Sequence, residues 1–383
     1  MSTTNFLSLL GGLALFLYGM QMMSSGLEAA AGDRMKEILE KLTSNRFLGV
    51  LVGAAITAVI QSSSATTVMT VGFVNAGMMS LTQAVWIIMG ANIGTTITGQ
   101  LIALDVGAIA PLIAFIGVVL VVFIKKPQLQ HIGTIFAGLG VLFIGMEMMS
   151  SAMLPLREEP AFIQIMTSFS NPLLGILAGA VFTAVIQSSS ASVGILQALA
   201  TSGLIGLDGA VYVLFGQNIG TCITAVLASI GTGREAKQTT IIHLTFNLIG
   251  TAIFTTVCIL TANTSLSLTD LVSSWTPGNP AAQIANMHTL FNVVTTLLLL
   301  PFGTYLAAFA QVLPLKDEPK SEVLQFLKPL PSYTKAIGKS AISLQQVDEE
   351  IAHMIELAQR NVEQGFEQLL KYDRKIGEEI IKR

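Results

Sequence analysis

One glutamine followed by three serines occurs twice in this chain, each time inside an apolar segment. The first copy is Gln61–Ser64 and the second is Gln187–Ser190, 126 residues later. Thr-Ala-Val-Ile precedes the glutamine and Ala follows the last serine in both copies. Hydroxyl and amide groups are costly among apolar residues, and membrane proteins keep them there to bind ions or substrates. The pair therefore predicts one polar site built from two copies of a unit.

Two further matches have the same offset. Gly90–Thr96 corresponds to Gly216–Cys222, and Gly19–Ser25 corresponds to Gly145–Ser151. Three ungapped matches at one offset indicate an internal duplication rather than chance.

The composition is that of a membrane protein. Of the 383 residues, 52% are hydrophobic and 11% are charged, and the mean hydropathy is +0.69. Soluble domains carry roughly 25% charged residues. The net charge of −3 and the lack of a basic surface argue against nucleic-acid binding. The two cysteines, Cys222 and Cys258, lie in apolar runs and are expected to be core residues.

The apolar runs predict an all-α polytopic membrane protein that contacts lipid. Each run that could cross a bilayer has about 20 residues. Seven such spans are expected: Asn5–Met23, Leu81–Leu104, Val106–Ile124, Ile132–Met149, Gly209–Ile230, Gln238–Leu260 and Ile284–Ala310.

The two Gln-Ser-Ser-Ser regions are different, because the polar motif divides each of them into short arms. Phe47–Ile60 and Ala65–Met78 flank the first motif, and Leu173–Ile186 and Ala191–Ile205 flank the second. Such arms are too short to cross a core of about 30 Å. We therefore expect two re-entrant hairpins, which survive at membrane depth only where protein or a water-filled cavity surrounds them.

With three true crossings in each repeat, the second repeat is inverted relative to the first. The basic residues then separate by face, as the positive-inside rule requires. One face holds Arg34, Lys36, Lys41, Arg46, Lys125, Lys126, Arg234, Lys237 and Lys316, and the other holds only Arg157. This places the N-terminus outside and the C-terminus in the cytoplasm of a cell-membrane protein. The expected domains are 1–126 and 127–252 as repeats, 253–315 as a final transmembrane segment, and 316–383 as a linker and cytoplasmic helical tail.

The tail differs in composition from the rest of the chain. Pro319, Pro329 and Pro331 mark the linker, and charged sequence follows from about Ser340. One stripe of apolar residues continues at helical spacing: Leu344, Val347, Ile351, Ile355, Ala358, Val362 and Leu369. A single stripe predicts packing on another helix or on a second copy of the chain, as in a homo-oligomer.

The chemistry expected at the paired motifs is that of a sodium-coupled anion site. No Lys or Arg lies at mid-span. Half-helix N-termini can hold an anion instead, because they present unpaired N–H groups and a positive dipole end. The predicted anion ligands are Ser62, Ser63, Ser64, Ser188, Ser189 and Ser190.

Bound sodium would supply further positive charge, and it prefers hard oxygen ligands. The predicted sodium ligands are Gln61, Thr66, Asn92, Thr95, Thr96, Gln187, Ser192, Asn218, Thr221 and Thr224. Asn92 and Asn218 stand beside glycines, which predicts local unwinding that frees backbone carbonyls.

Two further sets are predicted to support the site. His243 with Asn247 and His288 with Asn292 share a His-x-x-Phe-Asn pattern and could hold the unwound helices in place. Glu147 replaces Gln21 of the first repeat. It is either a functional intramembrane carboxylate or an interfacial, solvated group.

The paired Gln-Ser-Ser-Ser motifs, the two Asn-Ile-Gly-Thr stretches and His243–Asn247 resemble the type II sodium–phosphate cotransporter family, in its bacterial form. The resemblance covers about residues 5–310. It implies that the hairpin serines and glutamines form the phosphate and sodium sites. The implied activity is import of inorganic phosphate with sodium by alternating access. Bacterial members often append a PhoU-like helical domain, and Asp348–Arg383 resembles the first helices of one.

Three alternatives remain open at this point. The substrate could be another oxyanion, such as sulfate or a dicarboxylate. The chain could be a phosphate sensor or scaffold that acts through its tail. An intramembrane hydrolase with a serine nucleophile would need a base within hydrogen-bond reach, and only His243 and His288 lie at mid-span. Because that reading leaves the duplicated serines unexplained, we expect no enzyme activity.

Overall fold

The structure is a computed structural model that describes residues 2–31, 45–75, 77–104, 106–262, 264, 267–315 and 339–370. These residues contain helices and connecting turns, with no strand among them. Met1–Ile230 together with Arg234–Leu315 forms one compact unit, which holds every expected span. The second unit contains the helix α17 (Lys339–Leu370). The expectation of an all-helical protein is confirmed.

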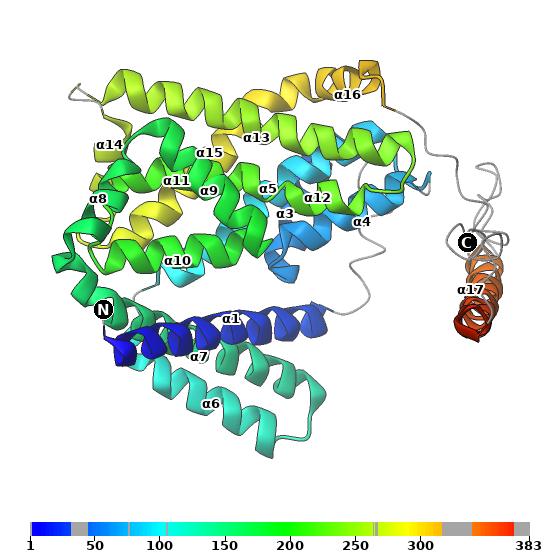
Figure 1. Cartoon of the computed structure of the whole chain (residues 1–383), viewed down its shortest axis with the longest axis horizontal. Coiled ribbons are helices and arrows are strands. Elements are labelled where there is room, and N and C mark those ends of the chain that lie inside the picture. Colours follow the sequence, from blue (N-terminus) through cyan, green and yellow to red (C-terminus); the bar gives the residue numbers. More distant parts are fainter. Residues whose placement is uncertain are drawn as a thin grey trace. The chain divides into compact units, whose positions relative to one another are not determined.

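From α3 onward, the helices of the first unit follow one another with short connections (Figure 1). In chain order they are α1 (Thr3–Ala31), α3 (Arg46–Ile60), α4 (Ser63–Asn75), α5 (Leu81–Ile102), η1 (Gly107–Ile109), α6 (Ala110–Phe123), α7 (Pro127–Met153), η2 (Leu154–Glu158), α8 (Pro160–Ser168), α9 (Pro172–Ile186), α10 (Ser189–Thr201), α11 (Leu207–Gly220), α12 (Ile223–Ala228), α13 (Arg234–Thr261), α14 (Leu268–Trp275), α15 (Pro280–Leu299), η3 (Leu300–Phe302) and α16 (Gly303–Val312).

Six stretches of the described residues are long and apolar enough to cross a membrane. They are Thr3–Ala30, Leu81–Ile102, Pro127–Glu158, Leu207–Ala228, Arg234–Thr261 and Pro280–Val312. The seventh expected span, Val106–Ile124, instead forms the shorter apolar segment Gly107–Phe123. Its helix begins late because Pro111 stands in the first turn of α6, a position that favours a helix start.

Each Gln-Ser-Ser-Ser motif separates two short helices. Gln61 ends α3 in the left-handed region with φ 59°, and Gln187 ends α9 in the same way with φ 58°. The preceding helices have 15 residues and the following ones have 13 in both copies. At 1.5 Å per residue these arms are about 22 Å and 20 Å long, which is shorter than a membrane core of about 30 Å.

Close helix packing holds these arms against the long helices. A Cβ atom on Gly90 of α5 would lie 2.0 Å from the Val50 carbonyl oxygen of α3. The equivalent Cβ on Gly216 of α11 would lie 2.0 Å from the Ile176 carbonyl oxygen of α9. Only glycine permits this approach, so α3 packs on α5 in the same way as α9 packs on α11.

The same packing corrects one expectation. Unwinding was expected beside Asn92, yet α5 is continuous from Leu81 to Ile102. Gly94 lies at a helix contact, where a Cβ would be 2.4 Å from the Ala54 carbonyl oxygen, and Gly220 makes the equivalent contact in the second copy, 2.3 Å from that of Ala180. In the second copy the helix does break, since α11 ends at Gly220 and α12 begins at Ile223.

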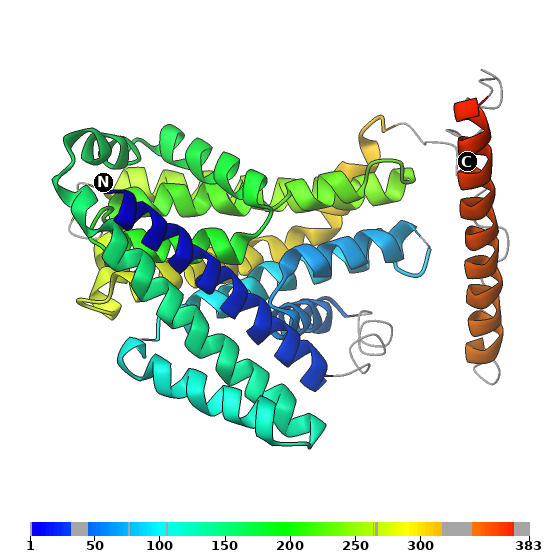
Figure 2. The same cartoon turned by 60° about the horizontal axis from the view of Figure 1, so that its bottom comes forward.

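The helices α1, α7 and α6 lie side by side along one face of the unit (Figures 1 and 2). Helices α1 and α7 touch through glycines. A Cβ on Gly12 would lie 2.8 Å from the Gly145 carbonyl oxygen, and one on Gly19 would lie 2.6 Å from that of Gly138. Small residues of this kind let membrane helices approach closely.

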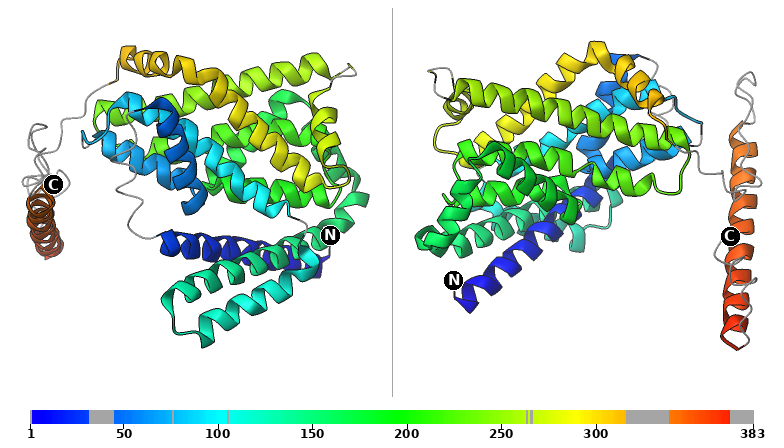
Figure 3. Two further views of the ribbon diagram at one scale, coloured as in Figure 1. Left: turned by 180° about the vertical axis from the view of Figure 1, so that it is seen from behind. Right: turned by 45° about the horizontal axis from the view of Figure 1, so that its top comes forward.

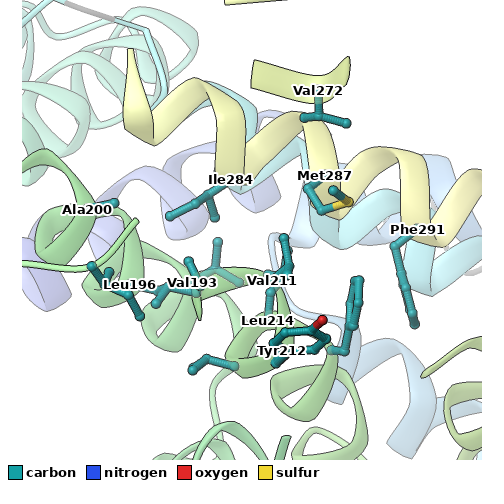
Figure 4. Packing of buried hydrophobic residues seen from close by; sticks show 14 of the residues in the cluster. Val193, Leu196, Ala200, Val211, Tyr212, Leu214, Val272, Ile284, Met287 and Phe291 are labelled. Carbon is teal, nitrogen blue, oxygen red and sulfur yellow. The ribbon is translucent and has the colours of Figure 1, made fainter. Parts of the chain in front are cut away.

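The largest buried cluster joins α10, α11, α13 and α15. Phe215 stacks on Phe291 with ring centroids 5.1 Å apart. Ile284 on α15 points toward Leu196 and Val193 on α10 (Figure 4). Helix α15 runs diagonally across the unit and leads into α16 (Figure 3). This packing fixes α10 between α11 and α15.

Some expectations fall on residues outside the described part of the chain. They concern the basic residues Arg34, Lys36, Lys41 and Lys316, and the prolines Pro319, Pro329 and Pro331. The helix expected in the tail is confirmed by α17. Ile351, Ile355 and Val362 of its apolar stripe are exposed.

Candidate functional site

The two helix breaks meet inside the unit. The hydroxyl oxygens of Ser63 and Ser189 lie 3.5 Å apart and are buried. These serines are equivalent positions of the duplicated sequence, 126 residues apart. Each is the first residue of its helix, α4 or α10. Two helix N-termini therefore come together at one point.

Two more hydrogen bonds cross between the copies, and they are reciprocal. The Ser190 hydroxyl donates to Thr98 Oγ1 at 3.3 Å. The Thr224 hydroxyl donates to Ser64 Oγ at 3.2 Å. Thr98 and Thr224 are equivalent positions, as are Ser64 and Ser190. The second break thus contacts α5, which follows the first break, and the first break contacts α12 in the equivalent part of the second copy. We refer to Ser63, Ser64, Ser189, Ser190, Thr98 and Thr224 as the central cluster.

Sequence reasoning missed Thr98, which is 1% exposed. The 126-residue offset from Thr224 was the signal that could have found it. Thr98 also donates to Gln61 Oε1 at 2.6 Å, so it joins the glutamine of the first break to a serine of the second.

The two glutamines have different surroundings. Gln61 is 6% exposed, and its amide donates to the Ala58 carbonyl oxygen as well as accepting from Thr98. The side chain of Gln187 is exposed. The site is therefore not symmetric at its glutamines, although both backbones have the same conformation.

The first serine of each motif acts locally. Ser62 Oγ accepts from the Ala65 N–H at 3.1 Å, and Ser188 Oγ accepts from the Ala191 N–H at 3.2 Å. These bonds cap the N-termini of α4 and α10. The second and third serines of each motif make the contacts with the other copy: Ser63, Ser64, Ser189 and Ser190.

Thr66 and Ser192 lie one turn into α4 and α10. Thr66 Oγ1 accepts from Thr57 Oγ1 at 2.9 Å in the first copy. In the second copy the equivalent oxygens, Thr183 Oγ1 and Ser192 Oγ, are buried and have no hydrogen-bond partner. Gln217 Oε1 is a third such oxygen, and the Gln217 amide donates to the Ser192 carbonyl oxygen at 3.0 Å.

The remaining predicted sodium ligands bond mostly to their own helices. The donors Asn92, Thr95, Thr96, Asn218 and Thr221 each reach a carbonyl oxygen three or four residues earlier, at 2.8 to 3.0 Å. Their oxygens keep free lone pairs in this arrangement.

Histidine and asparagine side chains brace the helices behind the site. His288 Nε2 lies 3.2 Å from Asn218 Oδ1, which ties α15 to α11. The Asn247 amide donates to Cys222 Sγ at 3.4 Å, which ties α13 to the break between α11 and α12. His243 and Asn292 are buried on the same two helices. None of these groups contacts the motif serines through a described hydrogen bond, and Glu147 lies in a separate cavity.

Comparison with known proteins identifies the family. The model of the family described as Na+/Pi-cotransporter matches residues 15–151 and 158–271, which is more than half of the chain. The chain belongs to the Na+/Pi-cotransporter family.

This member of the cotransporter family is similar to several known proteins. It is 37% identical to "Uncharacterized protein YqeW" of Bacillus subtilis, over 75% of this chain and 91% of that protein. It is 27% identical to "Putative inorganic phosphate export protein YjbB" of Escherichia coli, over 98% of this chain and 68% of that protein. "Sodium-dependent phosphate transport protein 2A" of Rattus norvegicus is 37% identical over 25% of this chain and 15% of that protein. No solved structure matches the chain.

The Na+/Pi-cotransporter family is a family of phosphate transporters and not of enzymes. With six candidate spans among its described residues, this member is a multi-pass membrane protein. The central cluster suits that chemistry. Its six hydroxyl groups can donate hydrogen bonds, and two helix N-termini begin beside them. None of its residues carries a charge, so an oxyanion there would be held by hydroxyl groups and helix dipoles.

Proposed function

We propose that this protein moves inorganic phosphate across the membrane together with sodium, by alternating access of one central site. The observation that carries the proposal is the contact between Ser63 and Ser189 at the start of α4 and α10. It brings both copies of the duplicated motif to one uncharged, hydroxyl-rich point in a family of phosphate transporters.

We further propose that the two copies are inverted-topology repeats. A two-fold relation makes equivalent residues meet at the axis and makes other contacts reciprocal. Ser63 with Ser189 is the first kind of contact. The two serine–threonine bonds, and the pairs Gly12 with Gly145 and Gly19 with Gly138, support the second kind. Residues 1–126 and 127–252 are the proposed repeats, followed by a final segment 253–315 and the tail 316–383.

The α3–α4 and α9–α10 pairs are the proposed re-entrant hairpins. Their arms are too short to cross, and the serines that begin the second arms, Ser63 and Ser189, are buried within protein, as irregular backbone at membrane depth requires. A 100° bend separates α8 from α9, so α8 does not extend α9 into one straight span.

Phosphate is proposed to bind the hydroxyl groups of Ser63, Ser64, Ser189 and Ser190, with Thr98 and Thr224 beside them. Ser62 and Ser188 contribute by capping the helices whose N-termini face the anion. Charge-assisted hydrogen bonds from hydroxyl groups to an oxyanion are about twice as strong as neutral ones.

Sodium is proposed to use the neutral oxygens around the cluster. Gln61, Gln187, Thr66, Asn92, Thr95, Thr96, Asn218 and Thr221 are candidates from the sequence. The unpartnered oxygens of Thr183, Ser192 and Gln217 favour the second copy, because a buried acceptor without a donor suits a cation or a water.

The proposed orientation places the C-terminus in the cytoplasm. The basic residues Arg46, Lys125, Lys126, Arg234 and Lys237 support it, because they flank helix ends on the face opposite to Arg157 in the inverted-repeat topology.

The direction of transport has two candidates. A sodium gradient directed inward drives import, and the name of the rat relative points to sodium dependence. The name of the E. coli relative points to export of inorganic phosphate. We propose import. The uncharged site needs a cation to offset the charge of the anion, and if that cation is sodium, its inward gradient drives phosphate inward.

The test is phosphate flux in proteoliposomes with defined gradients. An inward sodium gradient is expected to drive phosphate accumulation, and replacing sodium with choline is expected to abolish it. Sulfate in excess should not compete. Equal accumulation in choline would refute sodium coupling, and loss of preloaded phosphate independent of sodium would favour an exporter.

A further inference from the structure

A cavity of 420 Å³ lies apart from the central cluster, where several helices end. Ala103 and Leu104 follow the end of α5, Thr201 is the last residue of α10, and Ser150 lies in the last turn of α7. The start of α15 completes the wall. Glu147 is the one charged side chain among the described residues that line it.

The helix ends around this cavity favour a cation. Helices α5, α7 and α10 all point their C-termini at this region, and a helix C-terminus carries a partial negative charge. The short helix η1, which leads into α6, begins at Gly107 on the cavity wall, and α15 also begins there. Its first residue, Pro280, has no N–H group, and Asn279 Oδ1 accepts from the Ala282 N–H at 3.0 Å. The N-terminus of α15 therefore has few free N–H groups to offer to an anion.

The cavity also offers oxygen ligands. The carboxylate of Glu147 is exposed to the cavity and lies beside η1, 3.9 Å from where a Cβ on Gly107 would stand. Ser150 lines the same cavity, and its Oγ is buried and has no hydrogen-bond partner. A carboxylate with neutral oxygens is the ligand chemistry of a hard cation, and the same charge repels a phosphate ion.

Gln197 links the wall of this cavity to the residue that follows Thr98 of the central cluster. Gln197 is completely buried, and its amide donates to the Gly99 carbonyl oxygen at 3.0 Å and to the Ala281 carbonyl oxygen at 2.9 Å. Gly99 follows Thr98 of the central cluster, and Ala281 lines the cavity. The cavity wall at Ala281 and the backbone beside Thr98 are therefore joined through one buried side chain.

We propose that this cavity is a sodium-binding antechamber in which Glu147 holds the cation before it enters the central cluster. The inference rests on the proposed sodium-coupled function and adds a site on its route. It explains why a carboxylate stands at a position where the first repeat has Gln21. The first repeat needs no carboxylate at Gln21 if sodium enters the site from only one side of the membrane.

The test compares Glu147→Gln with Glu159→Gln at constant ionic strength. Glu159 is an exposed carboxylate near the same helix ends, but it does not line the cavity. The sodium concentration for half-maximal phosphate flux is expected to rise about threefold to tenfold in E147Q, since the cation loses the charge of Glu147, the one charged side chain among the described lining residues. Glu159→Gln should match the wild type, and Glu147→Asp should restore most of the affinity. The phosphate concentration for half-maximal flux at saturating sodium should stay within about twofold.

A second readout does not depend on transport. Sodium should raise the melting temperature of each protein, and choline should not. The wild type and E159Q should need less sodium than E147Q for the same increase in melting temperature. If E147Q fails to fold, Ser150→Ala with the same two readouts takes its place and should weaken sodium binding. Unchanged sodium dependence in a folded variant overturns the antechamber while leaving the proposed function intact. A wild type without any sodium dependence refutes the proposed function itself.

Discussion

Replacing Ser63 or Ser189 with alanine is expected to weaken phosphate binding about tenfold or more in each single variant. A hydrogen bond to a charged group contributes about 1.5–3 kcal/mol, and both hydroxyl groups lie where the two copies meet. Equal losses from two residues 126 positions apart would reflect one shared ligand. Equilibrium binding of radiolabelled phosphate to purified protein in sodium measures the effect.

The neighbouring serines provide matched controls. Ser62→Ala and Ser188→Ala remove hydroxyl groups that cap α4 and α10. We expect these variants to lose about 1 kcal/mol of stability and to change phosphate affinity less. If S63A and S189A bind phosphate with wild-type affinity while the cap variants do not, the ligand lies at the caps and the central cluster is only packing.

Adding one methyl group at Gly216 is expected to disrupt the fold. The new Cβ of Gly216→Ala would lie 2.0 Å from the Ile176 carbonyl oxygen, and backbone cannot move aside as a side chain can. Overpacking costs about 1–3 kcal/mol and occasionally more, and this contact is at the severe end. Gly90→Ala, the equivalent change, should behave alike because its Cβ meets Val50 in the same way. Melting temperature in detergent and elution on gel filtration measure the loss.

Gly72→Ala in α4 is the matched control. A Cβ there meets nothing within 4 Å, so alanine should be neutral or stabilising by about 0.5–1 kcal/mol. A Gly216→Ala protein as stable as Gly72→Ala would show that α9 and α11 are not packed as described, and it would remove the support for how the second break is positioned.

Much of the helical architecture follows from the sequence because membrane spans need long apolar runs. Six of the seven expected spans have helices of sufficient length. The end of α3 at Gln61 was also predictable, since a polar motif interrupts an apolar run. The helical segment within Val106–Ile124 is shorter than expected, and α8 (Pro160–Ser168) was not expected at all. In both places a proline in the first turn sets where the helix begins, and hydropathy does not show that boundary.

The residues around the site were harder to predict. Asparagine beside glycine suggested unwinding in both copies, but only the second copy breaks, between α11 and α12. The glycine contacts are alike in the two copies, so they do not account for this difference. Thr98 was missed because a threonine in an apolar helix carries no signal of its own. The different exposure of Gln61 and Gln187 depends on which helices pack beside each tip, and a duplicated sequence gives no sign of it.

The most direct test of the central site is the position of a bound phosphate analogue. Arsenate has the same shape and charge type as phosphate, and arsenic gives an anomalous X-ray signal that locates it without ambiguity. In crystals grown with sodium and arsenate, we predict one peak within hydrogen-bond reach of Ser63 or Ser64 and of Ser189 or Ser190. A peak bound only to residues outside the two motifs would contradict the proposal that the two helix breaks together form the phosphate site.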